Sequence, residues 1–269
     1  MPEPSFVRLR GRRFAYVDHG GPGPVLLALH GHFGRATLFG PLAEALRGRY
    51  RVVALDQRGH GLSENGGDFA PEEYADDAAA FLCSLESAPA AVVGHSMGGA
   101  VAYFLAARHP ALVSALVVAD MTTRNHEPET RPVLDVSAWP HRTGSRAQLR
   151  SAIEADVPDA SYFLDSAAEF DDGWGLLFDT ADMMASQRAL VGDFGKVWAA
   201  SRQPALLLRA GKSFVLTGET ARLMARARPH TELVELPGCG HWLYADAPRT
   251  FADTVDSFLD RALRTGAHE

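Results

Sequence analysis

The sequence predicts an α/β fold, in which a mostly parallel, twisted sheet is covered by helices on both faces. Short continuous apolar runs such as Val25–Leu29 alternate with segments whose apolar residues recur at helical spacing, such as Glu72–Leu85. Continuous apolar runs are typical of parallel strands, because these are buried on both faces. The chain has 269 residues, which is within the range of one large domain of this class.

The first part of the chain gives an edge hairpin and then regular alternation. Phe6–Arg10 and Arg13–Asp18, joined at Gly11, are typical of two short paired strands. The expected elements that follow are the strand Val25–Leu29, the helix Thr37–Leu46, the strand Tyr50–Leu55, the helix Glu72–Leu85, the strand Ala90–Val93, the helical segment Ala100–Arg108 and the strand Ala115–Ala119.

The alternation stops after Asp120. From 121 to 198 the strand-like runs give way to prolines, clustered acids and scattered large apolar residues, which predicts a mainly helical insertion with a short strand near Trp174–Phe178. The pattern then resumes with the strand Ala205–Arg209, the helix Thr217–Arg228, the strand Thr231–Leu236 and the helix Pro248–Leu263. We therefore predict a core formed by 1–120 and 199–269, interrupted by an insertion at 121–198.

Composition argues against several classes of protein. The net charge of −7 comes from interspersed residues, and no basic stripe suggests a nucleic-acid partner. Cys83 and Cys239 form neither a disulfide framework nor a metal-binding pair, and His126 and His141 lack metal-ligand spacing. With no signal-peptide pattern and no run of about 18 apolar residues, we expect a cytoplasmic protein without a membrane partner, metal or organic cofactor.

The most informative stretch is Gly94-His95-Ser96-Met97-Gly98. It follows the apolar run Ala90–Val93 and precedes the Ala-rich segment Ala100–Arg108, which is the strand–turn–helix context of a nucleophile elbow. Glycines allow strand and helix to pack closely there, and the helix directs its positive end towards an oxyanion forming at the serine. Ser96 is therefore the candidate nucleophile.

Three further motifs accompany the elbow: His30-Gly31, Asp56-x-Arg58-Gly59-x-Gly61-x-Ser63 and Gly238-x-Gly240-His241. In order and spacing, over almost the whole chain, these landmarks resemble the α/β-hydrolase superfamily, in particular small esterases with an inserted cap. The resemblance implies the α/β-hydrolase fold, with 121–198 as the cap.

The resemblance also assigns the base and the oxyanion donors. A serine hydroxyl needs a neighbouring base, and the family's base corresponds to His241. Elbow geometry gives one oxyanion donor, the main-chain N–H of Met97. The family's second donor corresponds to the N–H of His32, with Phe33 as the alternative. The His32 imidazole faces either the pocket or solvent, and His95 and His30 are expected to have structural roles.

The acid that orients the histidine is a choice between two residues. Most relatives carry it after the strand that corresponds to Ala205–Arg209, but that slot holds Phe214 here. Some relatives place it at the end of the preceding strand, where this chain has Asp120. Both loops open at the same edge of the sheet. We predict Asp120, with Glu219 as the alternative, although first-turn residues of a helix more often interact with its dipole.

The predicted function is a serine hydrolase that cleaves a carboxylic ester, lactone or thioester of a partly apolar small molecule through an acyl-enzyme. Candidate substrate-binding residues are Phe33, Trp139, Trp174 and Trp242. The alternatives are carbon–carbon bond hydrolysis, a biosynthetic thioesterase or cyclase, a proline-releasing aminopeptidase using Glu169, Asp171 and Asp172, and a ligand-binding receptor on the same fold. The sequence leaves the oligomeric state open.

Overall fold

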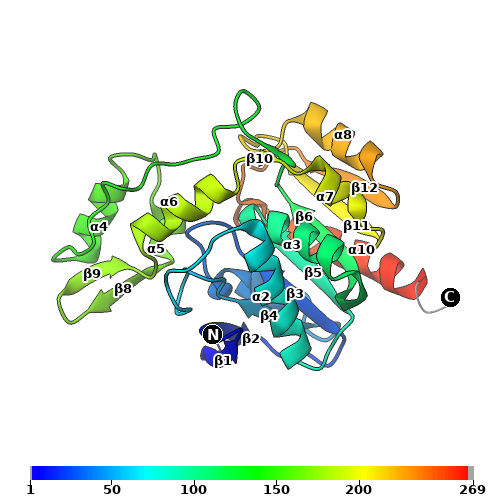
Figure 1. Ribbon diagram of the computed structural model, residues 1–269, viewed down its shortest axis with the longest axis horizontal. Coiled ribbons are helices and arrows are strands. Elements are labelled where there is room, and N and C mark those ends of the chain that lie inside the picture. Colours follow the sequence, from blue (N-terminus) through cyan, green and yellow to red (C-terminus); the bar gives the residue numbers. More distant parts are fainter. Residues whose placement is uncertain (1, 266–269) are drawn as a thin grey trace.

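The computed structural model describes residues 2–265 and centres on an eight-stranded sheet of order β1-β2-β4-β3-β5-β6-β11-β12 (Figure 1). β1 and β2 form an antiparallel hairpin at one edge, and the strands from β4 to β12 in this order are parallel. The strands are β1 (Ser5–Leu9), β2 (Arg12–Asp18), β3 (Val25–Leu29), β4 (Arg51–Leu55), β5 (Ala90–His95), β6 (Val113–Ala119), β11 (Ala205–Ala210) and β12 (Thr231–Leu236). The predicted α/β class and parallel core are confirmed.

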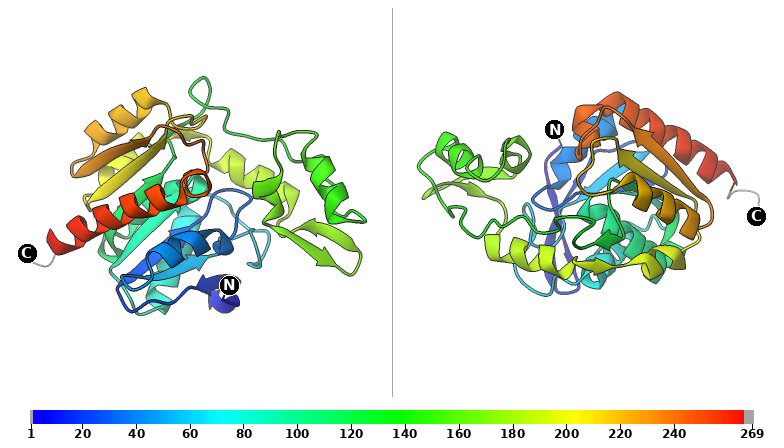
Figure 2. Two further views of the ribbon diagram at one scale, coloured as in Figure 1. Left: turned by 180° about the vertical axis from the view of Figure 1, so that it is seen from behind. Right: turned by 90° about the horizontal axis from the view of Figure 1, so that it is seen from above.

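Helices cover both faces of this sheet (Figure 2). Successive residues of β3 point to opposite faces, with Leu27 in one apolar cluster and Leu26 in the other. One face is covered by α2 (Pro71–Ser84), α3 (Met97–Arg108) and α8 (Gly218–Ala227). The other is covered by α1 (Gly40–Ala45), α9 (Leu243–Asp246) and α10 (Pro248–Thr265). Because α3 is buried along almost its whole length, the elbow helix is fixed rigidly against the sheet.

One expected helix is divided in two. The segment predicted as a single helix from Thr37 to Leu46 forms a 3-10 turn, η1 (Ala36–Phe39), and then α1 (Gly40–Ala45). Pro41 lacks a backbone N–H and fits only in the first turn of a helix, so the α-helix starts again at Gly40.

Much of the segment predicted as an insertion lies beside the sheet and extends away from it, on the left in Figure 1. Its apolar cluster includes Phe33 of the core together with Trp139, Phe163 and Met183. The expected short strand is present as β9 (Gly173–Leu176), which pairs with β8 (Ala167–Phe170) in a hairpin. The segment contains β7 (Arg124–Asn125), α4 (Arg146–Ile153), α5 (Ser161–Leu164), β8 (Ala167–Phe170), β9 (Gly173–Leu176), α6 (Thr180–Ala189) and β10 (Gly192–Asp193).

The last helix of this region packs on the core. α7 (Gly195–Ala200) places the fully buried Trp198 against Tyr103 of α3, with ring centroids 6.1 Å apart. The indole N–H of Trp198 donates to the carbonyl of Met224 in α8 at 2.8 Å. The helices within residues 2–265 include none with the length and hydropathy of a membrane-spanning segment.

Candidate active site

Ser96 occupies a strained turn between β5 and α3. Its backbone has φ 53° and ψ −125°, which L-residues rarely adopt outside functional turns. A Cβ atom on Gly94 would lie 2.0 Å from the carbonyl oxygen of Gly98, and one on Gly98 would lie 2.1 Å from that of Leu29. Both positions therefore require glycine, because strand and helix approach each other closely around Ser96.

Sheet register brings Ser96 and Asp120 to the same edge. His95 of β5 pairs with Ala119 of β6, so the next residue of each strand emerges at the carboxyl end. Asp120 is fully buried and has a positive φ of 50°. This conformation is costly for a residue other than glycine, so the surrounding contacts must hold it.

Three donors hold the Asp120 carboxylate. Oδ2 accepts a hydrogen bond from Nδ1 of His241 at 2.8 Å and another from the hydroxyl of Ser213 at 2.7 Å, while Oδ1 accepts from the main-chain N–H of Ala210 at 2.9 Å. The expected contact between Asp120 and His241 is therefore present. With its proton on Nδ1, the imidazole leaves Nε2 free to accept a proton. Sequence reasoning missed Ser213, which directly precedes Phe214 in the slot considered for the acid.

The alternative acid lies elsewhere. Glu219 is exposed in the first turn of α8, which Thr217 caps, and no hydrogen bond or ion pair joins Glu219 to His241 within residues 2–265. Phe214, which fills the usual acid slot, is 63% exposed, and its ring lies 4.8 Å from that of His241. Phe214 therefore covers one side of the His241 imidazole, and the Asp120 carboxylate, at the end of β6, contacts its Nδ1.

Two further histidines brace the loops around the serine. The Nε2–H of His95 donates to the carbonyl of His241 at 2.7 Å, which fixes the histidine loop to the elbow. His30 donates from Nδ1 to the carbonyl of Gly31 at 2.8 Å and accepts the main-chain N–H of Gln57 at Nε2. Burial lowers the pKa of His30 to about 4 and that of His95 well below its usual value, so both rings are neutral near pH 7.

Ser96 and His241 line one cavity of about 560 Å³. The two side chains make no direct hydrogen bond, and such bonds often tighten only when substrate is bound. Of the predicted substrate-binding residues, Phe33 and Trp242 line the same cavity. Most of the remaining wall is apolar and comes from the insertion, with Val133, Leu134, Phe163 and Leu190 among its residues. Sequence reasoning missed these residues and the polar Thr130 and Arg131 beside them, because no pattern marks which side chains of an irregular loop face a cavity.

Trp139 and Trp174 are not brought to the cavity. Trp139 is 4% exposed, and its ring packs at 5.0 Å from Phe163, while its indole N–H donates to Asp156 at 2.8 Å. Trp174 lies in the β8–β9 hairpin, where its main chain pairs with Thr143. The insertion must bury an apolar core of its own, and Trp139 serves that core instead of the substrate pocket.

Both predicted oxyanion donors lie beside the serine. Met97 is the first residue of α3, so its N–H has no acceptor within that helix. His32 follows β3 in the facing loop, and the hydroxyl of Tyr162 donates to its carbonyl at 2.8 Å. Met97 and His32 both line the cavity. The positive end of α3 therefore faces the space next to Ser96.

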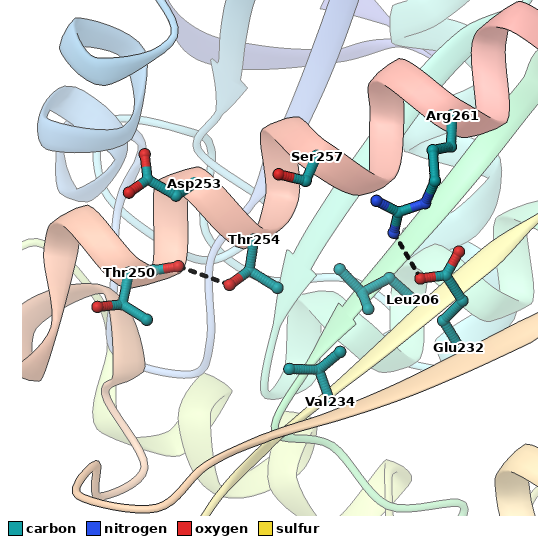
Figure 3. Close-up of a pocket in the computed structure, with 8 residues that line it drawn as sticks. All are labelled: Leu206, Glu232, Val234, Thr250, Asp253, Thr254, Ser257 and Arg261. Atoms are coloured by element: carbon teal, nitrogen blue, oxygen red, sulfur yellow. Dashed lines mark hydrogen bonds and ion pairs between the residues drawn. The ribbon is translucent and has the colours of Figure 1, made fainter.

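Other parts of the surface offer less chemistry. A shallow hollow between α10 and β12 is lined by Leu206, Val234 and polar side chains, and Arg261 pairs there with Glu232 at 2.6 Å (Figure 3). It contains none of the predicted site residues.

Within the described residues, no group of three or more His, Cys, Asp or Glu side chains could hold a metal ion. Glu169, Asp171 and Asp172 lie in the β8–β9 hairpin and its turn, away from the cavity lining.

Comparison with known proteins agrees with this geometry. The model of the alpha/beta hydrolase family matches residues 25–254. The chain is 29% identical to the 2-(acetamidomethylene)succinate hydrolase of Mesorhizobium japonicum over 266 residues, covering 93% of each protein. It is 30% identical to the sn-1-specific diacylglycerol lipase ABHD11 of Mus musculus over 253 residues, covering 88% of this chain and 81% of the lipase.

A solved structure is similar over the same range. The crystal structure of E-2-(acetamidomethylene)succinate hydrolase superposes with a TM-score of 0.85 at 25% identity, covering 96% of this chain and 99% of that one. Family match, identity and fold agree over nearly all of the chain. The protein therefore belongs to the alpha/beta hydrolase family and is an enzyme of the hydrolase type.

Proposed function

We propose that this protein is a serine hydrolase that cleaves a carboxylic ester, lactone or thioester of a partly apolar small molecule. The observation that carries the proposal is the 2.8 Å contact between Asp120 and His241, in the cavity that also contains Ser96. A nucleophile, a base and an orienting acid in this relation form the constellation used for acyl transfer on several unrelated folds.

The steps follow from the proposed roles. His241 Nε2 takes the proton of the Ser96 hydroxyl as Oγ attacks the substrate carbonyl, and Asp120 stabilises the imidazolium that forms. The oxyanion is bound by the main-chain N–H groups of His32 and Met97. The imidazolium then protonates the leaving alcohol or thiol, the C–O or C–S bond breaks, and an acyl-enzyme remains. Water, deprotonated by His241, hydrolyses that ester and restores Ser96.

Because the wall of the cavity is mainly apolar, we infer a substrate whose acyl or alcohol portion has hydrocarbon character. The diacylglycerol lipase named among the relatives agrees with such a substrate. The aminopeptidase alternative loses the three acids named for it, because Glu169, Asp171 and Asp172 lie outside the cavity lining, where Asp159 is the acidic residue. Carbon–carbon hydrolysis and a biosynthetic thioesterase or cyclase role use the same triad and differ in the bond that breaks or in the group that accepts the acyl portion.

A carboxylate-bearing substrate is the second candidate. Arg131 lines the cavity, its side chain is exposed, and no ion pair engages it within residues 2–265. An unpaired guanidinium on the wall of an apolar pocket suits a carboxylate, and succinate occurs in the name of one relative. Arg131→Gln should raise KM for p-nitrophenyl hemisuccinate about tenfold and leave p-nitrophenyl butyrate unchanged. Arg124→Gln is the matched control, since Arg124 is exposed outside the cavity lining.

The primary test labels and then removes the nucleophile. A fluorophosphonate probe should label the wild type at Ser96, and a panel of p-nitrophenyl esters, lactones and acyl thioesters should show turnover that Ser96→Ala abolishes. Labelling at another residue, or turnover retained in Ser96→Ala, would contradict the mechanism. Unchanged ligand binding without turnover in either protein would favour the receptor alternative.

A further inference from the structure

Hydrogen bonds connect the side chains of Tyr74, Ser186 and His32 in series, from the core to the wall of the substrate cavity. His32 lines the cavity, and its Nε2 lies 2.9 Å from the hydroxyl of Ser186 in α6. That hydroxyl lies 2.7 Å from the phenol oxygen of Tyr74 in α2. Ser186 is fully buried and Tyr74 is 2% exposed. Two hydrogen bonds thus join α2 of the core, α6 of the insertion and the loop that follows β3.

The direction of these bonds follows from the acceptors within reach. The Tyr74 hydroxyl has Ser186 as its hydrogen-bond partner in the described chain, and a buried O–H without an acceptor is costly. Tyr74 therefore donates to Ser186. The serine proton then has two possible acceptors, His32 Nε2 at 2.9 Å and the thioether sulfur of Met97 at 3.9 Å.

The imidazole nitrogen is the better acceptor. A thioether sulfur accepts hydrogen bonds weakly, and bonds arranged head to tail polarise and strengthen one another. The order Tyr74 to Ser186 to His32 meets both conditions. If the bond between Ser186 and His32 ran the other way, His32 would donate to the serine hydroxyl. The serine proton would then have the Met97 sulfur as its acceptor, at the longer distance of 3.9 Å.

This order fixes the tautomer of His32. A neutral imidazole that accepts at Nε2 carries its proton on Nδ1. Burial lowers the pKa of His32 to about 3, so the ring stays neutral near pH 7. Nδ1 has no hydrogen-bond partner among residues 2–265, and unlike the unpaired ring nitrogens of His60 and His95 it is not sealed in the interior. An N–H donor is thereby left open to the cavity.

We propose that the His32 side chain is a specificity-determining residue, whose Nδ1–H donates a hydrogen bond to a carbonyl or carboxylate oxygen of the substrate. Tyr74 and Ser186 are positioning residues that hold this tautomer. The inference rests on the proposed function in one respect, that substrate occupies this cavity. The side-chain donor is separate from the main-chain N–H of His32, which faces the oxyanion in the proposed mechanism.

The tautomer can be measured without any activity. In protein labelled with ¹⁵N-histidine, long-range ¹H–¹⁵N correlation spectra distinguish Nδ1–H from Nε2–H rings, and His32→Gln identifies the signal. We expect Nδ1–H in the wild type and a mixture of tautomers in Tyr74→Phe. Tyr103→Phe is the matched control, because it removes a buried phenol hydroxyl that has no partner in the described chain. An Nε2–H ring in the wild type, or an unchanged spectrum in Tyr74→Phe, overturns the proposal.

The functional readout compares two esters that differ by one carbonyl, p-nitrophenyl 4-oxopentanoate and p-nitrophenyl pentanoate. If the competent tautomer falls to between a third and a tenth of the population, KM for the oxo ester should rise about threefold to tenfold. Tyr74→Phe should leave kcat and KM for the pentanoate unchanged, as should Tyr103→Phe for both esters. Equal effects of Tyr74→Phe on both esters would overturn the specificity role. Failure of the proposed function would instead appear as an unlabelled Ser96, with the spectra unaffected.

Discussion

Asp120 and His241 are 121 residues apart in sequence, yet a carboxylate oxygen of Asp120 accepts a 2.8 Å hydrogen bond from His241 Nδ1. The two residues meet because β6, β11 and β12 are successive neighbours in the sheet, with Ala119 opposite Leu208 and Ala210 opposite Leu236, and the loop that carries His241 follows β12. Asp120 leaves β6 directly, so its position depends on a rigid strand. The histidine is placed by a loop that His95 ties to the elbow.

This contact predicts the consequence of neutralising the acid. Asp120→Asn should lower kcat by a factor of about 10⁴, and by at least about 10², because the amide neither fixes the tautomer of His241 nor stabilises the imidazolium. Glu219→Gln should have near-normal activity. Steady-state kinetics on an activated ester test both variants, and circular dichroism checks that each folds. The reverse order of effects would assign the acid to Glu219.

Ser213 should contribute through the acid. Its hydroxyl donates to the same Asp120 oxygen that binds His241, at 2.7 Å, so Ser213→Ala removes one of three donors to the carboxylate. Hydrogen bonds to charged groups contribute about 1.5–3 kcal/mol, and a water can replace part of this at a half-exposed position. We expect kcat to fall about tenfold with KM little changed. Ser213→Thr, which keeps the hydroxyl, is the control, and equal losses in both variants would argue against this role.

The parts of the site that the sequence predicted are those set by the sheet. Continuous apolar runs mark the buried parallel strands, and residues that directly follow such strands must emerge at one edge. This reasoning brought Ser96 and Asp120 to one region, whereas His241 was assigned through the resemblance to the α/β-hydrolase superfamily. It missed Ser213, because a serine in a loop has no periodic signal that marks its partner.

The insertion was predicted less well, for a physical reason. Apolar content indicates that a side chain is buried without showing which surface it is buried against. Trp139 was expected at the substrate and instead packs on Phe33 and Phe163, whereas the cavity wall includes the less conspicuous Val133 and Leu134. Arg131 reaches the cavity from an irregular loop, where neither helical nor strand periodicity applies.

The division between insertion core and cavity wall gives a paired prediction. Trp139→Ala removes a buried indole and should lower the free energy of unfolding by about 3–5 kcal/mol without a selective change in substrate preference. Leu134→Ala enlarges the cavity and should shift the preferred acyl chain towards longer esters, with a smaller effect on stability. Leu223→Ala is the control for both, because Leu223 is 41% exposed on α8. Urea denaturation and a chain-length series of p-nitrophenyl esters measure the two effects, and exchanged phenotypes would contradict the assignment.

The buried histidines predict how stability depends on pH. Burial lowers the pKa of His30 to about 4 and that of His60 to about 3, whereas in the unfolded chain each titrates near 6.5. Between these values the unfolded chain binds more protons, so the free energy of unfolding falls as pH falls from about 6.5 towards 4. Each ring contributes up to about 1.4 kcal/mol per pH unit in that window and nothing above it.

Urea denaturation at intervals between pH 7.5 and 4.5 measures this slope, and replacing one buried ring should reduce it. His60→Asn is expected to lower overall stability, because it disrupts a buried loop, yet its slope should be smaller than that of the wild type by about one proton. His141→Asn is the control, since it makes the same substitution at an exposed position. An identical slope in all three proteins would mean that His60 titrates in the folded protein as it does in the unfolded chain. That result would contradict the conclusion that burial lowers the pKa of His60.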